Sequence, residues 1–171
     1  MIMTLRARSI RAFTLVEVLV VVTIVGIAGA IVVPSMISAG TMGVQAAGRI
    51  VISDLLVAQN EAIAKQRPRR VVFEQEHDRY RLTDETGATL GVNWKAGDAT
   101  AGNYMVDFRT DERFAGVTIE NVDFGGDQTI EFDALGGPDS GGTLDVVFKD
   151  FRYRINVATM TGRVTIAPVS P

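Results

Sequence analysis

Cysteine is absent from the 171 residues, and histidine occurs once, at position 77. The first absence excludes disulfide bonds and thiolate metal sites in this chain. The second leaves no Ser–His or Cys–His catalytic arrangement, since His77 lies between Glu76 and Asp78 in a predicted turn. The glycine-rich "GGPDSGG" at residues 136–142 lacks the Gly-Lys-Ser/Thr of a phosphate-binding loop. We therefore expect no enzyme activity and no cofactor.

The acidic residues of the C-terminal half do not have the spacing of a calcium-binding loop. They lie at Asp123, Asp127, Glu131 and Asp133. We interpret them as part of a solvated acidic face and predict no metal site. Without the three arginines of residues 1–12, the chain has 14 Lys and Arg against 20 Asp and Glu, and this net charge of −6 makes it a poor candidate for general binding of nucleic acids.

Charge is scarce in the first quarter of the chain and follows a pattern there. Residues 1–12 contain three arginines and no acid, and residues 34–48 contain no charge. Between them, residues 13–33 form an apolar run of about 32 Å as a helix, which is enough to cross a bilayer once. The flanking charges then predict a cytoplasmic N-terminus and a C-terminal part on the other side of the membrane.

Glu17 is the one charged residue inside this apolar run. An ionised carboxylate near a bilayer centre costs about 2.5 kcal/mol or more, and less near an interface. A secretory signal peptide, ending near Ala28-Gly29-Ala30, is one interpretation of the segment, and a simple membrane anchor is another. Neither gives Glu17 a role.

The stretch "AFTLVE" from Ala12 to Glu17, with its basic leader and the apolar run behind it, resembles the signal of type IV pilins and type II secretion pseudopilins. The resemblance implies that a prepilin peptidase cuts between Ala12 and Phe13 and N-methylates Phe13. Glu17 then becomes the fifth residue of the mature chain and Pro34 the twenty-second, as in that family. The family prefers glycine where this chain has Ala12.

In that family, the glutamate is thought to pair with the terminal amine of a neighbouring subunit, so the resemblance makes Glu17 an assembly register. Pro34 is expected to bend the helix. The implied partners are the prepilin peptidase, other pilins or pseudopilins in a filament, and the inner membrane.

Beyond Pro34 the sequence predicts that the helix continues to about Gln66. An apolar stripe recurs every three or four residues at Val51, Leu55, Ala58 and Ala62, and Ile52, Leu56 and Ile63 are expected to widen it. The opposite, solvent-facing side is expected to hold Asp54, Asn60, Lys65 and Gln66. Arg67-Pro68 should end the helix, because a residue before proline disfavours the helical conformation.

From Arg69 onward the periodicity changes to that of short strands. Two strands, Arg69–Gln75 and Arg79–Asp84, are expected to form a hairpin, and Thr89–Asn103 an irregular excursion around Trp94. Six further strands are predicted at 104–108, 116–122, 128–133, 143–148, 153–158 and 163–167. The predicted fold class is therefore α+β, with a long N-terminal helix packed on an antiparallel sheet domain.

Three later stretches resemble H-type minor pseudopilins and FimT-like minor pilins: "AQNEAIAKQRPRRVVF", "TIEFDALGGPDSGGTLDVVF" and "YRINVATMTGRVTI". The resemblance implies a minor pseudopilin that helps to initiate the type II secretion pseudopilus for export across the outer membrane. The alternative is a FimT-like minor type IV pilin in pilus assembly or DNA uptake. Some major pseudopilins bind calcium through a C-terminal loop. For this chain, a calcium site is therefore the alternative to the solvated acidic face.

The predicted organisation is a leader (1–12), a transmembrane helical part (13–33), an amphipathic helical part (34–67) and a β-rich globular domain (68–171). The globular domain would lie in the periplasm. Arg67, Arg69 and Arg70, with Arg79 and Arg81, could form a basic strip that contacts DNA. We favour pairing of these arginines with interleaved acids instead: Glu74, Glu76, Asp78 and Asp84.

Overall fold

The computed structural model describes residues 14–92 and 102–169, without the side chains of residues 31–41 and 92. It divides into two compact units, Met1–Ser38 and Ala39–Pro171, each of which is described by itself. The predictions that concern Ala12, Phe13 and Trp94 lie outside the described residues.

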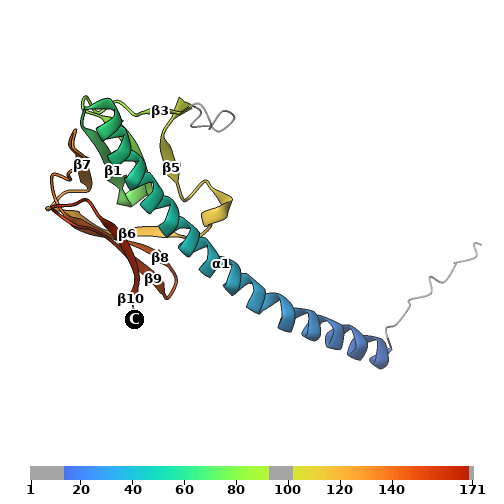
Figure 1. Cartoon of the computed structure of the whole chain (residues 1–171). Coiled ribbons are helices and arrows are strands. Elements are labelled where there is room, and N and C mark those ends of the chain that lie inside the picture. The colour runs from blue at the N-terminus through green and yellow to red at the C-terminus, as the bar shows by residue number, and fades with distance from the viewer. Residues whose placement is uncertain (1–13, 93–101, 170–171) are drawn as a thin grey trace, which may run out of the picture. The chain divides into compact units, whose positions relative to one another are not determined.

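Helix α1 comprises Leu15–Lys65, within two residues of the predicted helix at each end (Figure 1). It continues through Pro34, so the expected bend at this residue stays a prediction. In the part of the chain that the structure describes, no helix has both the length and the apolar character needed to cross a membrane. The membrane segment proposed for residues 13–33 begins outside the described part and also stays a prediction.

The second unit contains two four-stranded antiparallel sheets and a short strand pair. The first sheet has the order β5-β2-β1-β7, with β1 (Arg69–Glu74), β2 (Arg79–Asp84), β5 (Met105–Asp107) and β7 (Thr129–Phe132). The second has the order β10-β9-β8-β6, with β6 (Thr118–Phe124), β8 (Gly142–Phe148), β9 (Phe151–Val157) and β10 (Val164–Val169). The strands β3 (Gly91–Val92) and β4 (Gly102–Asn103) pair with each other.

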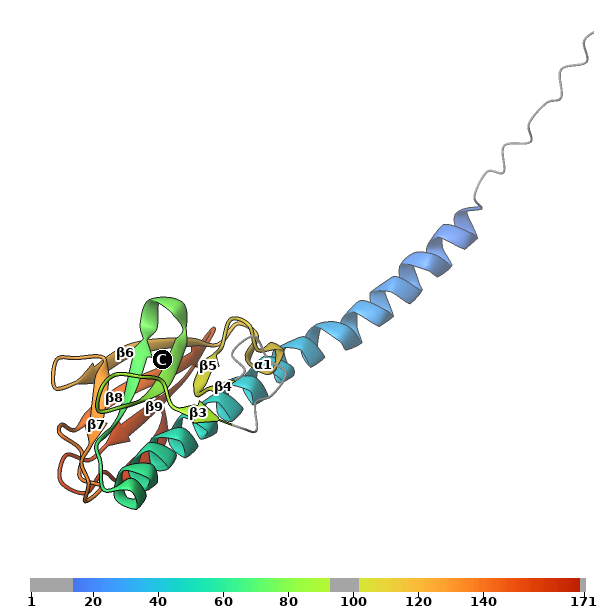
Figure 2. The ribbon, with the colours of Figure 1, turned by 90° about the horizontal axis from the view of Figure 1, so that it is seen from above.

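The α+β class and the eight predicted strands are confirmed, with bounds shifted by up to two residues. The pairing of the strands, however, divides them between two sheets, and the sequence pattern does not predict this division. Figures 1 and 2 show the part of α1 that belongs to this unit lying alongside both sheets.

The core of the second unit lies between α1 and the sheets. The four stripe residues of α1 have no exposed surface, as predicted: Val51, Leu55, Ala58 and Ala62. Ile52 is partly buried against the core and widens the stripe, whereas Leu56 and Ile63 are 41% and 43% exposed and do not belong to the buried core. The solvent-facing assignment of Asp54 is also wrong, since Asp54 is buried.

A short helical turn, η1 (Gln75–His77), joins β1 to β2 and contacts the second sheet. The Gln75 side-chain oxygen accepts a hydrogen bond from the Val122 N–H at 3.1 Å. The Asp78 carboxylate accepts one from the Ile119 N–H at 3.0 Å. Both amides belong to β6, the end strand of its sheet, so side chains of the first sheet's hairpin take the place of a neighbouring strand there.

Candidate functional site

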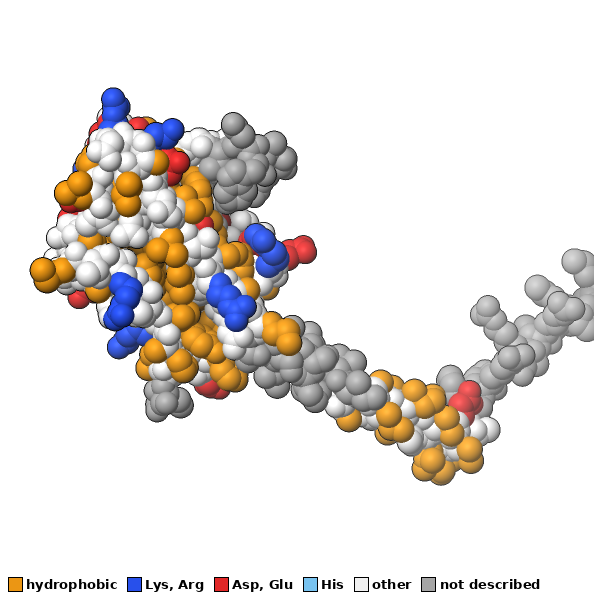
Figure 3. Space-filling view, viewed as in Figure 1, with side chains coloured by type: hydrophobic (Ala, Val, Ile, Leu, Met, Phe, Trp, Pro, Cys, Tyr) orange, Lys and Arg blue, Asp and Glu red, His pale blue; other side chains and the backbone are white. Residues whose placement is uncertain are grey.

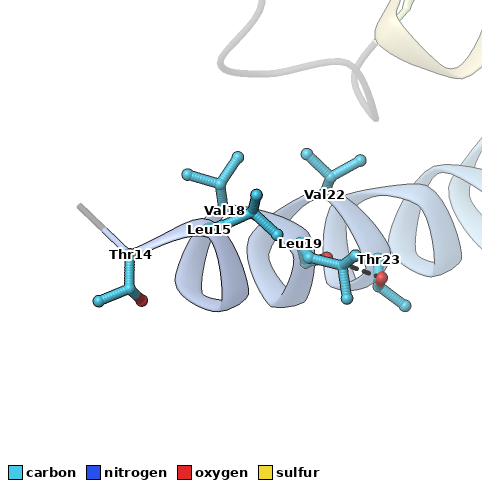
Figure 4. A pocket seen from close by; sticks show the side chains of 6 residues that line it. All are labelled: Thr14, Leu15, Val18, Leu19, Val22 and Thr23. Atoms are coloured by element: carbon cyan, nitrogen blue, oxygen red, sulfur yellow. Dashed lines mark hydrogen bonds between the residues drawn. The ribbon is translucent and has the colours of Figure 1, made fainter.

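The N-terminal end of α1 is an apolar helix with a polar cap. The Thr14 hydroxyl accepts a hydrogen bond from the Glu17 N–H at 3.1 Å, which is the Thr-x-x-Glu pattern of a helix N-terminus. Six residues line a hollow along this end of the helix (Figure 4): Thr14, Leu15, Val18, Leu19, Val22 and Thr23. The Thr23 hydroxyl donates to the Leu19 carbonyl at 2.8 Å, so both threonine hydroxyls in the hollow are hydrogen bonded within the helix.

Glu17 is the one charged side chain described in the first unit. Figure 3 shows that hydrophobic side chains cover most of the described surface of this part of the helix. Within the described part of the chain it forms no ion pair. Its position in the first turn is favourable for a negative charge, because the helix dipole is positive there. The Glu17 carboxylate is therefore available to a cation from another molecule.

Arginines at the start of the β domain are paired with carboxylates. Arg67 and Arg69 each lie 3.3 Å from Glu85. Arg70 pairs with Glu131, its neighbour in the register of β1 and β7. These acids are not the predicted partners, since Glu131 reaches Arg70 only through a strand pairing of distant segments.

The first hairpin repeats this pairing with a predicted acid. Glu74 accepts hydrogen bonds from Arg81 at 2.8 Å and from Arg79 at 2.5 Å. His77 is exposed and lies 4.0 Å from the same carboxylate. All five arginines of the proposed basic strip thus lie beside an acid, which weakens the field that would attract DNA. Contact of Arg67, Arg69 and Arg70 with nucleic acid stays a prediction.

Residues 7–33 match the family model described as the prokaryotic N-terminal methylation motif. The chain is also 26% identical over 164 residues to type II secretion system protein H of Xanthomonas campestris pv. campestris, covering 95% of this chain and 86% of the relative. The chain is thus similar to the pilins and pseudopilins over its N-terminal motif and to one H-type secretion protein over most of its length.

Two solved structures share the fold of this chain. The type IV minor pilin FimU of Pseudomonas aeruginosa superposes with a TM-score of 0.51 at 16% identity, over 73% of this chain and 88% of FimU. The minor pseudopilin EpsH of Vibrio cholerae superposes with a TM-score of 0.50 at 16% identity, over 75% of this chain and 96% of EpsH. At these identities, the comparison concerns the fold.

A buried polar cluster joins α1 to the β domain. The Asp54 carboxylate accepts hydrogen bonds from the hydroxyls of Tyr80, at 2.6 Å, and Tyr104, at 2.7 Å. Burial, followed by the nearby Asp54 charge, raises the pKa of Tyr80 well above its ordinary value. Burial and the hydrogen bond to Asp54 likewise raise the pKa of Tyr104. Both phenols therefore stay protonated and donate to Asp54.

A second cluster lies on the second sheet around Asp145, whose side chain has no exposed surface. The carboxylate accepts hydrogen bonds from Arg154 at 2.8 Å and from Arg152 and Asn121 at 2.9 Å. Arg152 also reaches Glu120 at 2.9 Å. Burial alone would raise the pKa of Asp145, but the bonds from Arg154, Asn121 and Arg152 outweigh it and lower the pKa to about 2.

This lowered pKa predicts a specific loss of stability in acid. Because the folded pKa of Asp145, about 2, lies below the ordinary 3.8, the stabilisation is complete above pH 3.8 and disappears as pH falls towards 2. Urea unfolding at pH 7 and pH 2 measures this loss. Between the two, the free energy of unfolding of the wild type should fall by about 2 kcal/mol more than that of Asp145→Asn. Asp150→Asn, at an exposed position, is the matched control. Equal pH dependence in the wild type and Asp145→Asn would contradict the assignment.

Proposed function

We propose that this chain is a minor pseudopilin, a non-enzymatic subunit of a type II secretion pseudopilus that aids filament initiation and protein export across the outer membrane. One observation carries the proposal: the similarity to type II secretion system protein H extends over 95% of the chain. It therefore includes both the apolar N-terminal segment and the β domain, whereas the methylation motif alone covers residues 7–33.

In this proposal, a prepilin peptidase removes residues 1–12 at the Ala12–Phe13 bond and methylates the new amine of Phe13. Residues 13–33 anchor the subunit in the inner membrane until it enters the filament. Residues 34–67 carry the helix, with a bend at Pro34, into the periplasm, where residues 68–171 form the globular domain. Support comes from the match of residues 7–33 to the methylation motif.

Glu17 is the proposed assembly residue. The helix begins at Leu15, behind the Thr14 cap, so the Glu17 carboxylate lies in the first turn. In the proposal, it pairs there with the amine that cleavage creates at Phe13 of a neighbouring subunit. An ionised acid surrounded by apolar side chains needs a cation, and separating such a pair is costly. The pair would thus align adjacent subunits.

The first test is the intact mass and the N-terminal residue of the protein purified from membranes of its native host. The proposal predicts a chain that begins with N-methylated Phe13. Ala12→Gly should be processed at least as fast as the wild type, because the family prefers glycine at that position. A chain that begins at Met1 would indicate a simple anchor, and one that begins near Ile31 would indicate a secretory signal peptide.

Replacing Glu17 by alanine tests the assembly role. We expect Glu17→Ala to insert into the membrane normally but to lower its amount in sheared filaments by at least about tenfold, since a buried ion pair is lost. Immunoblots of filament and membrane fractions measure both quantities. Glu61→Ala, which removes an acid from the second unit, is the control. Normal incorporation of Glu17→Ala would contradict the pairing.

A minor type IV pilin is the second candidate, because the fold also resembles FimU. Deletion of the gene in its host distinguishes the two. Loss of protein secretion with intact pili supports the pseudopilin, and loss of pili or DNA uptake with intact secretion supports the pilin. The pairing of all five arginines of the proposed basic strip with acids argues against direct DNA binding by this surface.

A further inference from the structure

The first hydrogen bonds of α1 show which group ends the helix at its N-terminal side. The Val18 N–H donates to the Thr14 carbonyl oxygen at 3.2 Å, which is an ordinary bond of the helical ladder. The next N–H towards the N-terminus, that of Glu17, donates instead to the Thr14 side-chain hydroxyl at 3.1 Å. Thr14 itself lies outside the helix, which begins at Leu15. The helix therefore begins where a side-chain oxygen replaces a backbone carbonyl as the acceptor.

Without this hydroxyl, the first N–H groups of α1 would need acceptors from the chain before Thr14. In a helix that continued towards the N-terminus, the Glu17 N–H would donate to the Phe13 carbonyl and the Val16 N–H to the Ala12 carbonyl. Apolar surroundings favour such an extension, because an N–H group without an acceptor is costly there. The Ala12 carbonyl belongs to the bond at which the proposed peptidase cuts.

The sequence before Thr14 contains no residue that would break a helix. Residues 1–13 include neither glycine nor proline, and Ala12 is of the residue type with the highest helix propensity. Thr4 and Ser9 could also cap a helix, but only Thr14 is followed three residues later by Glu or Gln. The position of the helix start therefore depends on the Thr14 side chain.

We propose that Thr14 is a positioning residue for the processing of this chain: its hydroxyl ends α1 beyond the Ala12–Phe13 bond and so leaves the carbonyl of this bond free for the peptidase. A carbonyl inside a helix is hydrogen bonded and shielded by the next turn. The cutting rate should then follow the fraction of molecules in which the bond lies outside the helix. This inference rests on the proposed function, which supplies the peptidase and the bond.

Substitutions at Thr14 test the inference in the full-length precursor, reconstituted in phospholipid vesicles with the prepilin peptidase of its native host. Thr14→Val keeps the shape of the side chain but removes the acceptor, and it should be cut about fivefold more slowly than the wild type. Thr14→Ser and Thr14→Asn retain a capping oxygen and should be cut within about twofold of the wild-type rate. Thr23→Val is the matched control, because the Thr23 hydroxyl bonds within the same helix but not at its start (Figure 4).

Two further measurements separate helix capping from direct recognition of the threonine. Ala12→Gly should restore fast cutting of Thr14→Val, because glycine opposes the extended helix about as strongly as the lost cap favours it. In detergent micelles without peptidase, the ¹³C chemical shift of the Phe13 Cα should be non-helical in the wild type. It should move towards the helical value in Thr14→Val.

Several outcomes would overturn the inference. They are equal cutting of Thr14→Val and the wild type, failure of Ala12→Gly to restore cutting, or a helical Phe13 shift in the wild type. Slow cutting of Thr14→Ser and Thr14→Asn would also overturn it, because the peptidase would then recognise threonine itself. All of these leave the proposed function intact. A wild type that is not cut between Ala12 and Phe13 would overturn the proposed function, and this inference with it.

Discussion

Replacing Asp54 by alanine is expected to lower the free energy of unfolding by about 3 kcal/mol, because it leaves two buried phenol hydroxyls without their acceptor. Tyr80 and Tyr104 approach the carboxylate from β2 and from the residue before β5, at 2.6 and 2.7 Å. Urea unfolding of the purified chain in detergent measures the change. The cluster joins α1 to the first sheet, so its loss should also speed proteolysis of the β domain.

Removal of a single tyrosine hydroxyl provides the control for Asp54→Ala. Tyr80→Phe removes one hydroxyl but leaves the other bond to Asp54, and should cost about 1 to 2 kcal/mol. In the double variant Asp54→Ala, Tyr80→Phe, one orphaned hydroxyl is gone, so the combined loss should be smaller than the sum of the single losses. Additive losses would show that Asp54 and Tyr80 act independently and would contradict the cluster.

Replacing Gly142 by alanine is expected to lower the free energy of unfolding by about 3 kcal/mol, although alanine usually suits a strand better than glycine. A Cβ at this position would lie 2.1 Å from the Asp123 carbonyl oxygen and 2.7 Å from the Phe124 Cα. These are backbone atoms, so a side-chain rotation cannot relieve the overlap. The close approach follows an irregularity in the register of β6 against β8, between Glu120 and Asp123.

Gly91→Ala is the matched control for Gly142→Ala, since Gly91 also lies in a strand. Its added Cβ would meet the Gly102 carbonyl oxygen at 3.4 Å, an ordinary contact. Thermal unfolding of both variants should therefore show a large fall in Tm for Gly142→Ala and a small change for Gly91→Ala. Equal effects would mean that β6 shifts away from β8 at little cost.

The N-terminal signal could be interpreted from sequence because all its residues are neighbours. The stretch Ala12–Glu17 and the apolar run are local, and the helix and strands follow from local periodicity. Asp54 was assigned to the wrong side of α1, because its two acceptor bonds come from tyrosines 26 and 50 positions away. A lone acid beside an apolar stripe gives no sign of such partners.

The ion pairs of the β domain were hidden for the same reason. Arg70 and Glu131 are 61 positions apart and meet only through the pairing of β1 with β7. The Asp145 cluster depends on Asn121, which lies at the irregular part of β6. Register and bulges are set by the packed sheet as a whole, so a pattern of single residues could not predict them.

The contact of the β1–β2 turn with β6 has a consequence for amide hydrogen exchange. The N–H groups of Ile119 and Val122 point away from β8, and on an ordinary end strand they would exchange with solvent quickly. Here Asp78 and Gln75 accept them, so exchange requires the turn to leave β6. These two amides should therefore exchange at the rate at which the first hairpin detaches. Although they lie in the second sheet, their exchange measures the motion of a hairpin of the first sheet.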